Sequence, residues 1–165
     1  MKILGVDPGI AIAGWGVVDF ENGKFRTLGY DSATTPAGMK TEDRLLSLFR
    51  DFELIINHYR PDEFASEELF WNTNQKTGIM VAEARGVILM TARKHGIPVF
   101  EYTPLQVKQA VVGYGRATKK QVIMMTTSIL NLKETPKPDD TADALAVTIC
   151  HAHSSSSPLG KYYNT

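Results

Sequence analysis

The sequence predicts an α/β fold with a mixed β-sheet, and two observations lead to that prediction. The first third of the chain contains three short, strand-like apolar runs separated by turn residues, which indicates antiparallel strands. The rest of the chain alternates helical and strand-like patterns. Strands separated by helices need crossover connections and usually lie parallel, so the complete sheet contains both kinds of pairing.

The three early strands are predicted from apolar runs and one turn signal. Residues 3–7 form an apolar run that ends in Asp7 and is closed by Pro8 and Gly9. Residues 13–20 and 24–30 read as the next two strands. Asn22-Gly23 between them is a strong hairpin signal.

The later elements follow from periodicity and from start and stop signals. Two further strands are expected at 63–70 and 97–102. Five helices are expected at 41–59, at 77–94, from Pro104, at 118–132 and from about Asp139 to His153. We expect residues 1–153 to form a single domain and residues 154–165 to form a disordered tail.

Composition narrows the class of protein. A chain of 165 residues that is 43% hydrophobic can bury a substantial core. No apolar run approaches the roughly 20 residues that cross a bilayer, and no signal-peptide layout is visible. The single cysteine, Cys150, lies in an apolar run and is expected to be buried. These features predict a cytoplasmic protein without a membrane segment.

Charge is distributed unevenly along a chain whose net charge is zero. Residues 85–137 contain nine basic and two acidic side chains, a net charge of +7. The remaining residues contain nine basic and sixteen acidic side chains, a net charge of −7. This asymmetry allows a basic binding surface beside an acidic pocket, although scattered solvated lysines would give the same count.

Three separate segments bring acidic residues that could meet. A carboxylate at the end of a buried strand needs a cation, so Asp7 is a candidate ligand, although an Asp before Pro-Gly can also be a turn residue. Asp140 and Asp143 are three residues apart and share one face of a helix. Helix capping would explain Asp140 but explains Asp143 less well.

The strand at 63–70 supplies a further carboxylate, either Glu67 or Glu68. Alternation groups Phe64 with Glu68 and Ala65 with Glu67 on opposite faces of the strand. Helices can cover both faces of such a sheet, so the pattern leaves the choice open.

Carboxylates without a nearby Cys/His cluster favour Mg²⁺ or Mn²⁺ over Zn²⁺. Two such ions held by shared carboxylates would activate water and stabilise the leaving oxygen of a phosphodiester. Together with the basic middle section, this chemistry indicates a nuclease.

Ordered blocks covering residues 2–153 resemble the RuvC family of Holliday-junction resolvases. The blocks include ILGVDPG, GWG, ASEELF, EARGV, PVFEY, QVKQ, VVGYG and DTADALA. The resemblance implies a ribonuclease-H-like fold with a mixed five-stranded sheet flanked by helices. It also implies a homodimer that nicks two opposed strands of a four-way DNA junction symmetrically, in recombination and repair, and a partnership with the branch-migration proteins RuvA and RuvB.

The resemblance also implies roles for individual residues. Its metal-binding catalytic carboxylates, which would hold two Mg²⁺ ions, correspond to Asp7, Glu67, Asp140 and Asp143 in this chain, with Mn²⁺ able to substitute. Cleavage would leave 5′-phosphate and 3′-hydroxyl ends. Lys108 and Lys119 correspond to family lysines near the scissile phosphate, and Phe70 to an aromatic residue near unpaired bases, although Phe70 could also be a core residue after the strand. Arg116 lies where the sequence varies around the matched lysine and is a further candidate for a phosphate contact.

Other interpretations remain beside this one. The opening strand also resembles the phosphate loop of actin-like ATPases, which need a second domain. A ribonuclease-H-like enzyme acting on RNA and a catalytically silent junction-binding protein are further alternatives. The helix at 77–94 is the expected dimer surface, and no role is assigned to Tyr114, His151 or His153.

Overall fold

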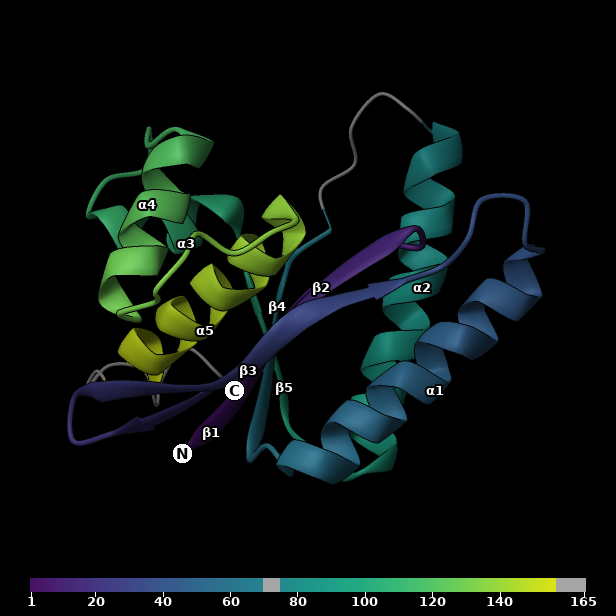
Figure 1. Ribbon diagram of the computed structural model, residues 1–165, viewed down its shortest axis with the longest axis horizontal. Helices are drawn as coiled ribbons and strands as arrows, with labels where there is room; N and C mark the ends of the chain where they lie inside the picture. Colours follow the sequence, from purple (N-terminus) through teal and green to yellow (C-terminus); the bar gives the residue numbers. More distant parts are fainter. Residues whose placement is uncertain (70–74, 157–165) are drawn as a thin grey trace.

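A mixed five-stranded sheet forms the centre of the computed structural model, which describes residues 1–69 and 75–156 (Figure 1). The strands lie in the order β3-β2-β1-β4-β5. Their bounds are β1 (Lys2–Asp7), β2 (Ile12–Glu21), β3 (Lys24–Thr34), β4 (Glu63–Glu67) and β5 (Val99–Tyr102). The prediction of a mixed sheet is confirmed, because β1, β2 and β3 pair antiparallel whereas β1, β4 and β5 pair parallel.

The predicted hairpin joins β2 to β3. Asn22 and Gly23 have φ angles of 51° and 75°, the two positive values that a type I′ turn requires. The parallel pairing of β1 with β4 has a different consequence. It brings the carboxyl ends of both strands, and therefore Asp7 and Glu67, to the same edge of the sheet.

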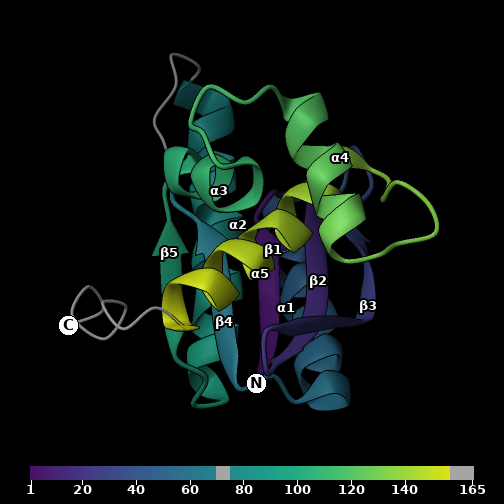
Figure 2. The same cartoon turned by 90° about the vertical axis from the view of Figure 1, so that its left-hand side faces the viewer.

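Helices cover both faces of the sheet (Figures 1 and 2). Helices α1 and α2 lie on one face, and α3, α4 and α5 lie on the other. Their bounds are α1 (Thr41–Tyr59), α2 (Gln75–Lys94), α3 (Pro104–Val112), α4 (Lys119–Ile129) and α5 (Asp139–Ser156). Each face has its own apolar core, with Phe64 on the α1–α2 side and Ala65 on the α5 side.

Helices α3 and α4 begin with the same local device. Thr103 and Thr118 each accept a hydrogen bond from the backbone N–H three residues later, and the glutamines there bond back to the threonine N–H. Such capping boxes satisfy amide groups that have no partner within the helix. The two helices and their connection, residues 104–129, are called the α3–α4 hairpin below.

Helix and strand ends differ from the predicted bounds by a few residues. Helix α4 ends at Ile129 instead of Leu132, and β5 begins at Val99 instead of Ile97. Helix α5 continues beyond His153 to Ser156, and the hydroxyls of Ser155 and Ser156 donate to the carbonyl of Ala152 in the preceding turn. The predicted tail beyond residue 156 lies outside the described residues.

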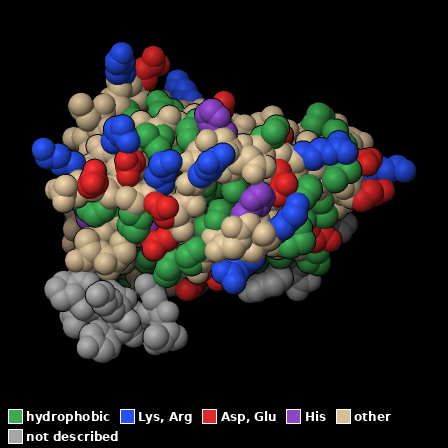
Figure 3. Space-filling model, turned by 90° about the horizontal axis from the view of Figure 1, so that it is seen from below, with side chains coloured by type: hydrophobic (Ala, Val, Ile, Leu, Met, Phe, Trp, Pro, Cys, Tyr) green, Lys and Arg blue, Asp and Glu red, His purple; other side chains and the backbone are tan. Residues whose placement is uncertain are grey.

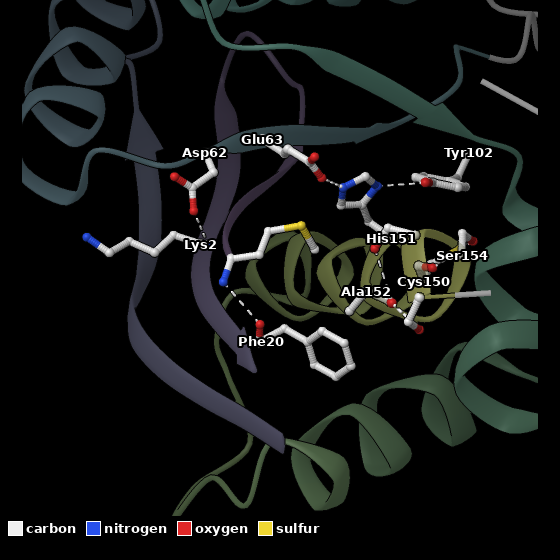
Figure 4. Close-up of polar contacts among 12 residues, drawn as sticks. Lys2, Phe20, Asp62, Glu63, Tyr102, Cys150, His151, Ala152 and Ser154 are labelled. Carbon is white, nitrogen blue, oxygen red and sulfur yellow. Dashed lines mark hydrogen bonds and ion pairs between the residues drawn. The ribbon is translucent and has the colours of Figure 1, made fainter. Parts of the chain in front are cut away.

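A buried polar chain fastens the second half of α5 to the sheet (Figure 4). His151, with no exposed surface, lies 2.5 Å from Glu63 through Nε2 and 2.7 Å from the Tyr102 hydroxyl through Nδ1. Burial lowers the pKa of His151, and the opposing effect of Glu63 is smaller. The neutral ring therefore donates to Glu63 and accepts from Tyr102.

Three further features bear on the sequence predictions. Cys150 is buried as expected, and burial raises the pKa of its thiol to about 12. Among the described residues, no helix combines the length and apolar character needed to cross a membrane. On the face that Figure 3 shows, acidic and basic side chains are interspersed.

Candidate active site

The alternation of β1 and β4 directs Asp7 and Glu67 toward α5. A Cβ atom on Gly5 would lie 2.3 Å from the Ala144 carbonyl oxygen, so the odd-numbered positions of β1 face this helix. Ala65 belongs to the α5-side core, and Glu67 shares its face of β4. Glu68 lies beyond the strand and is exposed, which distinguishes the two glutamates that alternation alone left open.

Helix α5 brings two more carboxylates to the same place. Its first turn crosses Gly14, the residue of β2 that pairs with Asp7. A Cβ atom on Gly14 would lie 2.0 Å from the backbone oxygen of Asp140, so only glycine allows this approach. Asp140 and Asp143 consequently lie beside the ends of β1 and β4.

Charge repulsion within this group is strong. Burial, followed by the charges of Asp143, Asp140 and Glu67, raises the pKa of Asp7 to about 7. Burial also raises the pKa values of Glu67 and Asp143, and the charge of Asp143 adds to the rise for Glu67. The four predicted carboxylates therefore form one electrostatically coupled cluster.

Two lysines from the α3–α4 hairpin face the cluster. The Lys119 ammonium lies 2.9 Å from an Asp143 oxygen and 3.6 Å from Asp139. Partial burial alone would lower the pKa of Lys119, but its bond to Asp143 and the neighbouring acidic charges raise it. Lys108 is near enough to Glu67 to oppose the rise in the pKa of that carboxyl.

The remaining predicted DNA contacts differ in position. Arg116 is exposed in the connection between α3 and α4. Phe70 lies outside the described residues. A groove of about 990 Å³ between β3 and residues 130–137 includes none of the four carboxylates, so the cluster and this groove are separate features.

The donor set fits a divalent cation. Within residues 1–69 and 75–156, no three His, Cys, Asp or Glu side chains are grouped closely enough to hold a metal ion as they lie. The clustered ligands are nevertheless all hard carboxylate oxygens, and their mutual repulsion is the kind that a divalent ion relieves. The Lys119 ammonium supplies part of that positive charge.

A mixed sheet of this order, flanked by helices on both faces, defines the ribonuclease-H-like class of proteins. The sequence matches the family model described as "Crossover junction endodeoxyribonuclease RuvC" over residues 3–151. The chain therefore belongs to the RuvC family, and it is a DNA endonuclease that resolves Holliday junctions.

Relatives and solved structures agree with this membership. RuvC of Ruminiclostridium cellulolyticum is 58% identical, over 93% of each chain, and RuvC of Alkaliphilus oremlandii is 55% identical, also over 93% of each. The structure of Thermus thermophilus RuvC in complex with a Holliday junction substrate gives a TM-score of 0.89 at 36% identity, covering 94% of both chains.

Two conclusions follow from the family. The predicted fold, enzyme class and reaction are confirmed, and the RNA nuclease, ATPase and catalytically silent alternatives are not favoured. Membership also implies use of a divalent metal ion and binding of four-way DNA junctions.

Proposed function

We propose that Asp7, Glu67, Asp140 and Asp143 hold two Mg²⁺ ions, which Mn²⁺ can replace, and that they form the catalytic centre for junction cleavage. The observation that supports this most directly is the coupling of all four carboxylates around Asp7. When bound, the ions supply an activated water and stabilise the leaving oxygen of an in-line displacement, giving 5′-phosphate and 3′-hydroxyl ends.

The side chains in and around the cluster have different proposed roles in binding metal and DNA. Asp7 is central, since the charges of the other three carboxylates all raise its pKa. Lys119 would exchange its bond with Asp143 for the scissile phosphate when cations occupy the cluster, because its ammonium group is only half-exposed and already lies at the site. Lys108 and Arg116 would bind flanking phosphates, and Phe70 would stack against an unpaired base.

We further propose that the enzyme acts as a homodimer through α2, so that two centres cut opposed strands symmetrically. Ile79, Glu83, Gly86 and Met90 lie at helical spacing on the exposed side of α2, and Ile79 and Met90 are each 53% exposed. Ile79 and Met90 are the apolar members of this side of α2, and exposed apolar side chains of this kind suit contact with a second copy. Cooperation with RuvA and RuvB in the cytoplasm remains a prediction from the family.

Cleavage of a synthetic four-way junction tests the catalytic proposal. The wild-type protein should produce paired, symmetric nicks with Mg²⁺, none with EDTA, and little cleavage of a linear duplex of the same sequence. Asp7→Asn should reduce the cleavage rate by at least a thousandfold while junction binding persists, because the variant loses a charged ligand but keeps the shape of the side chain.

Glu68→Gln provides a matched control on the residue next to Glu67. It should cleave at close to the wild-type rate, whereas Glu67→Gln should be inactive. Equal activity of Asp7→Asn and wild type, or metal-independent cleavage, would contradict the proposed catalytic centre. Light scattering of Met90→Asp should report a monomer if α2 forms the dimer contact.

A further inference from the structure

The α3–α4 hairpin is a uniformly basic wall of the active site. Between Tyr102 and Lys133 the sequence contains no acidic residue, while the hairpin carries Lys108, Arg116, Lys119 and Lys120. Lys119 bonds Asp143 and Lys108 acts on Glu67, so the hairpin directly adjoins the carboxylate cluster. A surface of one sign beside a phosphodiesterase centre is suited to a nucleic-acid strand.

The tip of this hairpin holds an exposed aromatic residue in a defined position. Gly113 ends α3 with a φ angle of 90°, which turns the chain sharply before Tyr114. A Cβ atom on Gly115 would lie 2.1 Å from Leu105 Cδ1, so the loop packs tightly onto the start of α3. Tyr114 nevertheless remains 47% exposed.

A hydrogen bond fixes the orientation of the Tyr114 ring. Its hydroxyl accepts from Gln121 Nε2 at 2.8 Å. Gln121 is itself held, because its Oε1 accepts from the backbone N–H of Thr118 at 2.8 Å in the capping box of α4. The ring is thus attached to the helix that carries Lys119, two residues from Gln121.

An ordered, exposed ring in this setting is suited to stacking. Its hydroxyl oxygen accepts from Gln121, and this bond holds the ring so that its exposed face is open for a nucleobase to stack upon. Leu105, 54% exposed, extends the apolar surface beside it, and Arg116 follows two residues later with a cation for the adjoining phosphate. Because the ring is ordered before binding, contact costs little conformational entropy.

We propose that Tyr114 is a DNA-contacting residue that stacks against an unpaired or unstacked base close to the junction crossover. This inference rests on the proposed function of the neighbouring carboxylates. It makes the hairpin tip a determinant of preference for junctions over linear duplex.

Binding measurements on a cleavage-deficient background test this role. In Asp7→Asn protein, adding Tyr114→Ala should weaken junction binding about tenfold and linear-duplex binding less than twofold. Tyr114→Phe should bind within twofold of its parent, because it keeps the ring and loses only the bond to Gln121. The salt dependence of binding should be unchanged in both, since no charge is removed.

A direct readout locates the contact. Junctions that carry 5-iodo-2′-deoxyuridine at successive positions near the crossover should cross-link to Tyr114 on irradiation, with the modified peptide identified by mass spectrometry. Tyr114→Ala should lose that cross-link while melting at the wild-type temperature. Unchanged junction binding by Tyr114→Ala, equal losses on junction and duplex, or a missing cross-link would overturn the proposal.

Results for the wild-type protein and for Tyr114→Ala distinguish failure of this proposal from failure of the proposed function on which it rests. Wild-type protein that cleaves junctions with Mg²⁺ while Tyr114→Ala cleaves and binds equally well would overturn the Tyr114 role alone. Failure of the wild-type protein to cleave any junction would instead overturn the proposed function, irrespective of Tyr114.

Discussion

The ionised form of Asp7 destabilises the folded state of this protein. The pKa of Asp7 is raised to about 7 by burial and by three acidic neighbours, so its ionised form is disfavoured in the folded state. A raised carboxyl pKa means that the folded state binds more protons than the unfolded chain between about pH 4 and pH 7. Without metal, stability should therefore fall as the pH rises through this range.

Asp7→Asn should consequently be more stable than the wild-type protein at pH 7.5 in EDTA. We expect a gain of roughly 1–3 kcal/mol, equivalent to a melting temperature higher by about 3–10 °C. Differential scanning calorimetry from pH 4 to pH 8 measures it, and Mg²⁺ should reduce the difference by stabilising only the wild type. A variant with a lower melting temperature in EDTA would contradict the repulsion.

The buried His151 contributes a pH dependence of the opposite sign. Because its pKa is lowered by burial, the unfolded chain binds the proton more readily, and stability is lost as the pH falls through about 6.5. Urea unfolding in the Asp7→Asn background, where the contribution of Asp7 is absent, should reveal this loss. Replacing His151 with Gln should remove the slope near pH 6.

Tyr102→Phe tests the same buried chain without changing a charge. Removing the hydroxyl leaves Nδ1 of a fully buried imidazole without its donor, at a cost of about 1–3 kcal/mol. Phe100→Leu offers a packing comparison, because Phe100 contacts the His151 ring and its replacement removes no hydrogen-bonding group. A stability loss confined to the Leu variant would exclude the hydrogen bond as the cause.

The positions of the carboxylates depend on how the helices and strands pack together, and Gly14 in β2 sets the position of α5. Any side chain at Gly14 would meet the backbone of Asp140, so Gly14→Ala must displace the first turn of α5. We expect a loss of about 1–3 kcal/mol of stability and weaker Mg²⁺ binding, measured by unfolding and by calorimetric titration.

Gly86→Ala is the matched control for that substitution. Within one protomer a Cβ atom there meets nothing within 4 Å. Gly86 lies inside α2 on the side proposed as the dimer contact, so light scattering should first show that the variant keeps the oligomeric state of the wild type. Alanine should stabilise the helix by about 0.5–1 kcal/mol and leave Mg²⁺ binding unchanged. If Gly14→Ala behaved like Gly86→Ala, close packing of α5 would not be what fixes the metal ligands.

A comparison of the helices and strands with their predictions shows which features local sequence patterns can predict. Regular periodicity and turn signals suffice to predict α1 over residues 41–59 and the Asn22-Gly23 hairpin. Alternation could not choose between Glu67 and Glu68, because both faces of β4 are covered and only the position of α5 breaks the symmetry. The hydrogen bonds from His151 to Tyr102 and Glu63 join residues up to 88 positions apart, and no local pattern predicts them.

At the scale of the whole molecule, a net charge of zero conceals the basic α3–α4 hairpin, which contains no acidic residue. Junction binding should therefore depend strongly on salt despite the neutral chain. Arg116→Ala should reduce the slope of log affinity against log salt concentration by about one, because one phosphate contact is lost.

Arg50→Ala is the comparison for this measurement. Arg50 is an exposed residue of α1, on the face of the sheet opposite the hairpin, and its removal changes the net charge equally. Its slope should match that of the wild type, as determined by fluorescence anisotropy at several salt concentrations. Equal slopes for both variants would indicate that net charge, not the hairpin, governs association.

The dispersal of the carboxylates along the chain also bears on how the protein is made in the cell. Asp7 and Glu67 are synthesised early, whereas Asp140 and Asp143 belong to the last helix. A polypeptide still growing on the ribosome thus holds only two of the four carboxylates proposed as metal ligands, and even the released chain brings the other two into place only when α5 docks across Gly14. On this proposal, nascent or truncated copies should not nick DNA, and the capacity to cut should arise with the completed fold.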